Sequence, residues 1–126
     1  MIRLLRTILY VPADNPRALA KAPSLPVDAV IVDLEDAVAP ARKDAARAEA
    51  IAAVAPLKAG GKEVAVRINA PDTPWYNDDI SEVRRAGFDG LVLPKVRTAI
   101  DVKRVALRSG MCVWPMMETA QAILEA

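Results

Sequence analysis

Five short apolar runs recur along the chain, and each is followed at once by a turn-forming or polar residue. The runs cover residues 8–11, 29–32, 64–68, 91–93 and 112–117, with stretches of helical composition between them. Strands that alternate with helices form parallel sheets, whose ligands bind at the carboxyl ends of the strands. The residues that follow the runs are therefore the first candidates for a functional site.

The pattern predicts strands over residues 7–11, 27–32, 64–69, 91–93 and 112–117, and helices over 17–22, 41–54, 79–86, 98–107 and 118–126. Asp14 or Asn15 is the expected cap of the first helix, with Pro16 in its first turn. The long loop 70–77 carries the pair Trp75-Tyr76, which we expect to be exposed.

Five β/α units in one domain, residues 1–126, correspond to half to two thirds of an eight-unit TIM barrel of about 250 residues. The predicted fold is therefore α/β, of parallel (β/α) TIM-barrel type, with only the first five units present. A five-stranded open sheet of flavodoxin type is the structural alternative. The first turn argues against it, because residues 12–16 contain no glycine-rich phosphate loop.

Charge and composition exclude several functions. Seventeen Lys and Arg against sixteen Asp and Glu give a net charge of +1, which offers no general attraction to nucleic acid or an anionic membrane. The chain has no histidine and one cysteine, Cys112, expected in the core, so a metal site would use oxygen ligands. No apolar stretch approaches the roughly 20 residues that span a bilayer, and the amino terminus lacks the features of a signal peptide. We therefore expect a cytoplasmic protein.

Period-two alternation places charged side chains together at one rim. In the third strand Val64, Val66 and Ile68 face the helices, while Ala65, Arg67 and Asn69 face the other way. By the same period, Asp33 and Glu35 follow the second strand on that inner face, and Glu118 follows the fifth. A structural ion-pair network among Asp33, Glu35, Asp36 and Arg67 is the alternative to a ligand site.

Five motifs in register resemble those of the citrate lyase beta-subunit-like branch of the HpcH/HpaI aldolase family. They are RTILYVPADNPR at 6–17, DLEDAV at 33–38 with Lys43 and the pair 46–47, VRIN at 66–69, LPK at 93–95 and MET at 117–119. The resemblance extends over essentially the whole chain. It implies a TIM barrel that cleaves or forms a carbon–carbon bond in a 3-hydroxy acid CoA thioester of citryl-CoA or malyl-CoA type.

The resemblance also implies Mg²⁺ as cofactor, with a small oxo-acid and an acyl-CoA or acyl-carrier thioester as partners. Such a metal stabilises negative charge without a histidine, and it needs only one or two protein carboxylates. By motif position Glu118 matches a metal ligand that also meets substrate, and Arg67 matches the arginine that pairs with the substrate carboxylate. Glu35 and Asp36 match an acidic pair that holds the metal's waters. Arg67, Glu35 and Asp36 are thus the candidate catalytic residues.

Other positions carry weaker expectations. Arg17 and Lys21, one helical turn apart, match positions that meet CoA phosphates, although ordinary solvated charges would look the same. Lys95 would suit imine chemistry in another barrel aldolase, but the resemblance points to metal chemistry instead. Glu118 would also suit a helix start, where a carboxylate is favourable.

The chain also departs from the family pattern. The second metal carboxylate of the family is expected beyond Ala126, and Ala122 stands where relatives often have glycine. A partial barrel would expose strand edges and apolar surface, so we expect a homo-oligomer and weak activity of the isolated chain. A non-catalytic truncated remnant or assembly subunit that keeps the fold is the functional alternative.

Overall fold

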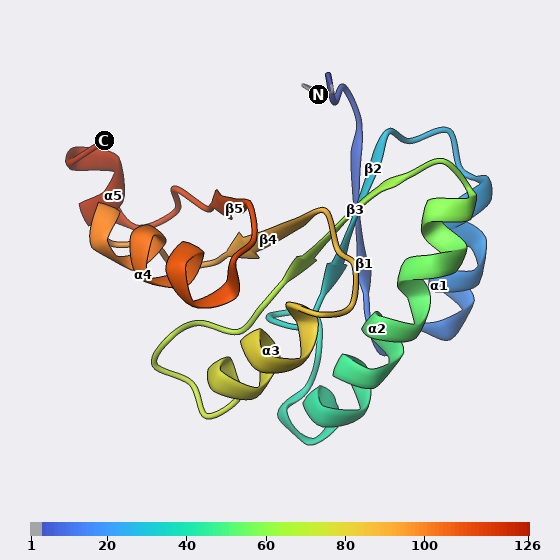
Figure 1. Cartoon of the computed structure of the whole chain (residues 1–126), viewed down its shortest axis with the longest axis horizontal. Coiled ribbons are helices and arrows are strands. Elements are labelled where there is room, and N and C mark those ends of the chain that lie inside the picture. Colours follow the sequence, from blue (N-terminus) through green and yellow to red (C-terminus); the bar gives the residue numbers. More distant parts are fainter. Residues whose placement is uncertain (1–3) are drawn as a thin grey trace.

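Five strands alternate with helices in the computed structural model, which describes residues 4–126 (Figure 1). The strands are β1 (Ile8–Pro12), β2 (Ala29–Asp33), β3 (Glu63–Arg67), β4 (Gly90–Leu93) and β5 (Val113–Pro115). The α-helices are α1 (Pro16–Lys21), α2 (Lys43–Ala59), α3 (Tyr76–Val83), α4 (Ala99–Ser109) and α5 (Ala120–Leu124), with short 3₁₀ helices η1 (Ala22–Ser24) after α1 and η2 (Pro40–Arg42) before α2. The predicted order of elements is confirmed, with bounds that differ by a few residues.

All neighbouring strands are parallel and lie in the order β1-β2-β3-β4-β5. A flavodoxin-type sheet has the order 2-1-3-4-5, so that alternative is wrong. Sequential order is the order of strands in the wall of a β/α barrel. The register places Pro12 opposite Asp33, and Asp33 opposite Arg67, so the ends of the first three strands are level.

The main core lies between the sheet and the helices. It joins strand residues such as Val30 and Val66 to Ala50 and Leu57 of α2 and Ile80 of α3, all of them buried. In Figure 1, α1 and α2 lie at one end of the sheet, and α4 and α5 lie at the other end beside β5. Burial of these apolar side chains is the principal driving force for the fold.

The other face of the sheet carries a smaller cluster, in which Trp114 and Met116 cover Ile31, Ala65 and Val92. The predicted alternation is confirmed here, because residues 31 and 65 point away from the helices while residues 64 and 66 point toward them. No helix contributes to this cluster within the described part of the chain.

Gly90 leaves room for the Trp114 ring on this face. A Cβ atom at position 90 would be 2.8 Å from Trp114 Nε1 and 2.9 Å from Cε2, which is closer than real side chains approach. The glycine is therefore required for the cover that the indole ring provides.

Local sequence explains the helix starts. The Asn15 side chain accepts a hydrogen bond from the Ala18 N–H, and Pro16 occupies the first turn of α1, as predicted. The second helix begins at Lys43 because the preceding residues form η2, and it continues through Pro56 to Ala59, beyond the predicted end at residue 54.

Two expectations about exposure are wrong. Tyr76 is buried at the start of α3, where its ring packs into the main core and lies 5.5 Å from the Arg108 guanidinium. Cys112 is exposed, because it lies just before β5 begins. Across residues 4–126 no helix is both long and apolar enough to cross a membrane.

Candidate functional site at the carboxyl ends of the strands

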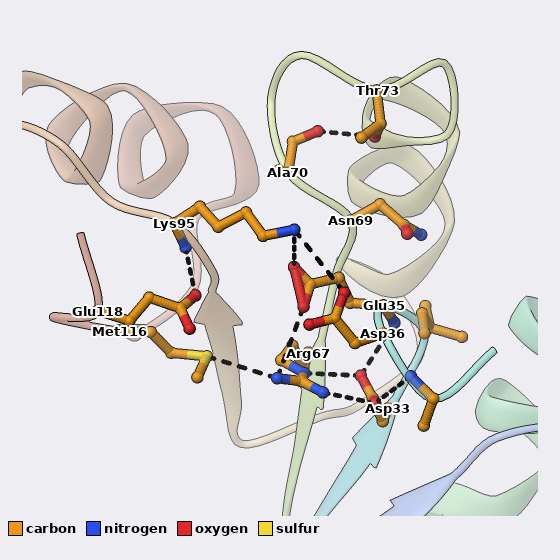
Figure 2. A network of polar contacts seen from close by, with 12 residues as sticks. Asp33, Glu35, Asp36, Arg67, Asn69, Ala70, Thr73, Lys95, Met116 and Glu118 are labelled. Atoms are coloured by element: carbon orange, nitrogen blue, oxygen red, sulfur yellow. Dashed lines mark hydrogen bonds and ion pairs between the residues drawn. The ribbon is translucent and has the colours of Figure 1, made fainter.

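The centre of the site is a two-point ion pair between neighbouring strand ends. Arg67 Nε donates to Asp33 Oδ1 at 2.7 Å, and Arg67 Nη2 donates to Asp33 Oδ2 at 2.6 Å (Figure 2). The residues are register partners at the ends of β3 and β2, so the backbone already sets the two side chains side by side. Two parallel hydrogen bonds of this kind fix the orientation of the guanidinium plane.

Asp33 is held from both sides. Its Oδ1 accepts from the Glu35 N–H at 2.9 Å, and its Oδ2 accepts from the Ala37 N–H at 3.2 Å. Burial opposes ionisation of Asp33, but the hydrogen bonds from Arg67 and the Glu35 N–H outweigh it and lower the pKa of this carboxyl group. The same pair raises the pKa of Arg67, first through its hydrogen bonds to Asp33.

Arg67 also contacts Tyr10 and Met116 and lines a hollow with them. The guanidinium carbon lies 5.0 Å from the centre of the Tyr10 ring, and Nη1 lies 3.9 Å from Met116 Sδ. A hollow of about 360 Å³ is lined by Tyr10, Pro12, Asp33, Ala37, Arg67 and Met116. Asp33 takes the Nε–Nη2 edge and Glu35 Oε1 lies 3.5 Å from Nη1, so an anion that entered this hollow would share the Nη1 side of Arg67 with Glu35.

Glu35 is a buried carboxylate without hydrogen bonds. It is 5% exposed, and neither oxygen has a hydrogen-bond partner within the described residues. Its nearest charges are Arg67 Nη1, 3.5 Å from Oε1, and Lys95 Nζ, 3.5 Å from Oε2. Burial is the main reason that the pKa of Glu35 is raised. A buried carboxylate without hydrogen bonds requires an explanation, because most buried polar atoms in proteins have a hydrogen-bond partner.

Lys95 connects Glu35 to the two other candidate carboxylates. Its Nζ lies 3.7 Å from Asp36 Oδ1, and its backbone N–H donates to Glu118 Oε1 at 2.7 Å. Glu118 is exposed and lies between β5 and α5. Figure 2 shows Glu118, Lys95, Glu35 and Arg67 arranged around one space at the rim. The structure therefore brings together all the candidate residues predicted at the strand ends.

Lys43 fixes the backbone of the acidic pair. This buried lysine at the start of α2 donates to the carbonyl oxygens of Leu34, at 2.9 Å, and Glu35, at 2.8 Å. Burial lowers the pKa of Lys43, and its ammonium also lies 5.1 Å from the centre of the Trp75 ring. Lys43 lines a second hollow of about 300 Å³, together with Glu35, Asp36, Val38, Pro40, Asn69, Ala70, Thr73, Trp75 and Lys95.

The prediction that Asn69 shares the inner face with Arg67 is wrong. Because β3 ends at Arg67, the alternation no longer holds at Asn69, which turns toward α3. The buried carboxylate of Asp79 accepts from the Asn69 N–H at 2.9 Å, from Asn69 Nδ2 at 2.7 Å and from Arg47 Nε at 2.8 Å. This arrangement anchors the loop that follows β3, whose residues Ala70, Thr73 and Trp75 line the second hollow.

Sequence reasoning missed the roles of Lys43 and Asp79. Lys43 follows the DLEDAV motif, but its sequence context predicts no particular contact, and Asp79 has no signal beyond its place near a helix start. Arg17 and Lys21 are exposed on α1, and within residues 4–126 neither forms a hydrogen bond or ion pair with the rim carboxylates. Their assignment to CoA phosphates stays a prediction.

The rim residues fit a magnesium ion that keeps open coordination positions. The donors are carboxylate oxygens, the type that Mg²⁺ prefers, and the two Glu35 oxygens are buried without hydrogen bonds. Among residues 4–126 no group of three or more Asp, Glu, His or Cys side chains is close enough to enclose a metal. That is compatible with Mg²⁺, which takes one or two carboxylates and fills its remaining positions with water or substrate.

Sheet and rim together define a parallel α/β protein with a cluster of charged side chains at its strand ends. The chain belongs to the HpcH/HpaI aldolase/citrate lyase family, whose model matches residues 6–111. This confirms the resemblance that the five motifs indicated.

Curated relatives include both hydrolytic and lyase proteins. A (3S)-malyl-CoA thioesterase of Cereibacter sphaeroides (strain ATCC 17029 / ATH 2.4.9) is 42% identical over 122 residues, which cover 96% of this chain and 43% of the relative. The citrate lyase subunit beta of Leuconostoc mesenteroides subsp. cremoris is 44% identical over 97 residues, covering 77% of this chain and 32% of the relative. The chain thus spans less than half the length of these curated relatives.

A solved structure shares the fold. The protein CitE from Mycobacterium tuberculosis, in complex with magnesium, acetoacetate and coenzyme A, superposes with a TM-score of 0.80 at 31% identity. The match covers 98% of this chain and 43% of CitE. The five parallel strands and their helices therefore match a section of this larger α/β protein.

Proposed function

We propose that this chain forms the metal and oxo-acid part of a magnesium-dependent carbon–carbon lyase that acts on a 3-hydroxy acid CoA thioester. Its five β/α units would then form part of the wall of a TIM barrel. The partners would be a small oxo-acid and an acyl-CoA or acyl-carrier thioester. The family membership and the citrate lyase and malyl-CoA relatives support this reaction class.

Arg67 would bind the carboxylate of the oxo-acid. Its Nε–Nη2 edge is occupied by Asp33, which fixes the plane of the guanidinium, and Arg67 lines the hollow of about 360 Å³. A substrate carboxylate at that edge would meet a donor that is already oriented, which reduces the entropy lost on binding. The Tyr10 ring would shield the pair from water on one side.

Glu118 would ligate Mg²⁺, while Glu35 and Asp36 would hold its water ligands. When bound, Mg²⁺ would supply electrostatic stabilisation for the negative charge that develops on the oxo-acid oxygen. Lys43 would keep Glu35 in place through the two carbonyl oxygens of its loop. Arg67 and Lys95, each 3.5 Å from Glu35, favour its ionised form.

The observation that carries this proposal is the buried Glu35 carboxylate with no hydrogen-bond partner. A purely structural network would satisfy these oxygens, because an unsatisfied buried acceptor costs about 1–3 kcal/mol. A ligand shell that completes the site explains why this cost is tolerated. The structural ion-pair alternative accounts for the Asp33–Arg67 pair and for the two cations 3.5 Å from Glu35, but it leaves both Glu35 oxygens without a hydrogen bond among the described residues.

Calorimetric titration with Mg²⁺, in the presence and absence of oxaloacetate, tests the proposal. We expect the oxo-acid to strengthen Mg²⁺ binding and Glu118→Ala to abolish Mg²⁺ binding. Arg67→Lys should weaken oxaloacetate binding by about tenfold or more, because lysine cannot form the two-point contact with Asp33 that orients the guanidinium. Arg85→Lys, at an exposed position on the chain after α3, is the matched control. Equal binding by Arg67→Lys and Arg85→Lys would contradict the role of Arg67.

Thioester hydrolysis is a second candidate, favoured by the 42% identity to a malyl-CoA thioesterase over 96% of this chain. The two reactions are separated by their products from malyl-CoA. A lyase releases acetyl-CoA and glyoxylate, whereas a thioesterase releases malate and free CoA. Chromatography of the CoA species after incubation with Mg²⁺ therefore distinguishes them.

A further inference from the structure

Lys95 contacts Glu118 through its backbone N–H and the Glu35–Asp36 pair through its side-chain ammonium. Its backbone N–H donates to Glu118 Oε1 at 2.7 Å, while its Nζ lies 3.5 Å from Glu35 Oε2 and 3.7 Å from Asp36 Oδ1. With φ of 52°, it is the only non-glycine residue in the described chain with a positive φ. Such a backbone is unfavourable for an L-residue and is often found at functional sites.

A hydrogen bond to Glu118 holds the Lys95 backbone, whereas only two longer ion-pair contacts hold its ammonium. The distances from Nζ to Glu35 and Asp36 exceed those of ordinary hydrogen bonds, and the side chain is 54% exposed. Arg67, the other cation beside Glu35, is 13% exposed and held by two short hydrogen bonds to Asp33. Of these two cations, only Lys95 can move away without breaking a short contact.

We propose that Lys95 is an internal counter-cation, which holds the Glu35–Asp36 pair in the absence of metal and is displaced when Mg²⁺ binds. This inference rests on the proposed function. The ammonium and the metal's hydration shell would approach the same carboxylate oxygens, and two neighbouring cations repel each other. The buried Glu35 oxygens make the competition effective, since no hydrogen bond within the described residues holds them otherwise.

Displacement would also couple metal binding to anion binding. The released ammonium stays tethered at the rim, because the Lys95 backbone remains bonded to Glu118. There it can pair with a carboxylate of the incoming oxo-acid. Coupling is reciprocal, so the oxo-acid would strengthen Mg²⁺ binding by the same factor by which Mg²⁺ strengthens oxo-acid binding.

Calorimetry with Mg²⁺ alone tests this role without an activity assay. We expect Lys95→Met to bind Mg²⁺ about three- to tenfold more tightly than the unmodified protein, because one competing and half-exposed charge is removed. Lys95→Arg keeps the positive charge and should show no gain. Lys103→Met makes the same charge change at an exposed position in α4 and should leave Mg²⁺ affinity unchanged.

A second titration, with oxaloacetate present, measures the coupling. In Lys95→Met we expect oxaloacetate to strengthen Mg²⁺ binding by a smaller factor than in the unmodified protein. Unchanged or weaker Mg²⁺ binding by a folded Lys95→Met protein would overturn the inference while leaving the proposed function intact. Absence of Mg²⁺ binding in every protein, with and without oxaloacetate, would overturn both.

Discussion

The contrast between Asp33 and Glu35 yields a sharp prediction about stability. Asp33→Asn keeps the shape of the side chain but replaces one carboxylate oxygen with an NH₂ group. All four hydrogen bonds that the Asp33 carboxylate accepts come from N–H donors, two on each oxygen. Whichever oxygen is replaced, two donors lose their acceptor, and one of them belongs to the Arg67 guanidinium.

The expected loss is large for a domain of this size. Breaking a buried ion pair by removing one partner costs about 3–5 kcal/mol. Single domains are stable by only about 5–15 kcal/mol, so the midpoint of thermal unfolding should fall by about 10–20 °C. Glu35→Gln is the matched control, because the Glu35 side chain is buried in the same loop but its carboxylate oxygens accept no hydrogen bond within residues 4–126.

Urea unfolding followed by far-UV circular dichroism measures both variants against the unmodified protein. We expect a severe loss of stability in Asp33→Asn and a gain of stability in Glu35→Gln at pH 7. If the two variants lost the same free energy of unfolding, then the hydrogen bonds to Asp33 would not be what holds the rim together, and the reasoning would fail.

Two further predictions concern pH and packing. Burial raises the pKa of Glu35 above its ordinary value of 4.5, so the folded protein binds a proton at Glu35 more tightly than the unfolded chain does. Above the raised pKa the ionised Glu35 side chain therefore lowers the free energy of unfolding. Glu35→Gln should therefore be more stable than the unmodified protein at pH 7, and the difference in the free energy of unfolding should vanish by about pH 4. A constant difference in urea unfolding between about pH 4 and pH 7 would contradict this reasoning. Gly90→Ala should lower the free energy of unfolding by about 1–3 kcal/mol, because the added methyl group displaces the Trp114 ring. In a Trp75→Phe background Trp114 is the remaining tryptophan, and an unchanged fluorescence spectrum would contradict the displacement.

Sequence patterns predicted the charged residues at the strand ends well, because the alternation of side chains between the two faces of a sheet is a local property of a strand. Arg67 and Asp33 were assigned to the same face, and their register pairing made the contact almost unavoidable. The same rule failed at Asn69, since alternation has no meaning beyond the end of β3. The partner of Asn69 is Asp79, ten residues later, and only the packing of α3 brings the two together.

The features that could not be predicted all depend on tertiary contacts. A lysine in a motif gives no sign that its ammonium will bind the carbonyl oxygens of Leu34 and Glu35, as Lys43 does. Nor does a Pro-Lys sequence reveal the positive φ of Lys95 or its bond to Glu118. Tyr76 was expected to be exposed because it follows a polar, proline-rich loop, but it begins the helix that closes the core.

The sequential order of the strands has a consequence for how the chain acquires its structure during synthesis. Each strand pairs with the one made just before it, and each helix packs close to its own strands, so no segment waits for a distant partner. Pairing between consecutive strands closes shorter loops than pairing between strands far apart in the chain, so it costs less loop-closure entropy. Units that leave the ribosome can therefore add one after another to a growing edge, with Asp33 already in position when Arg67 emerges.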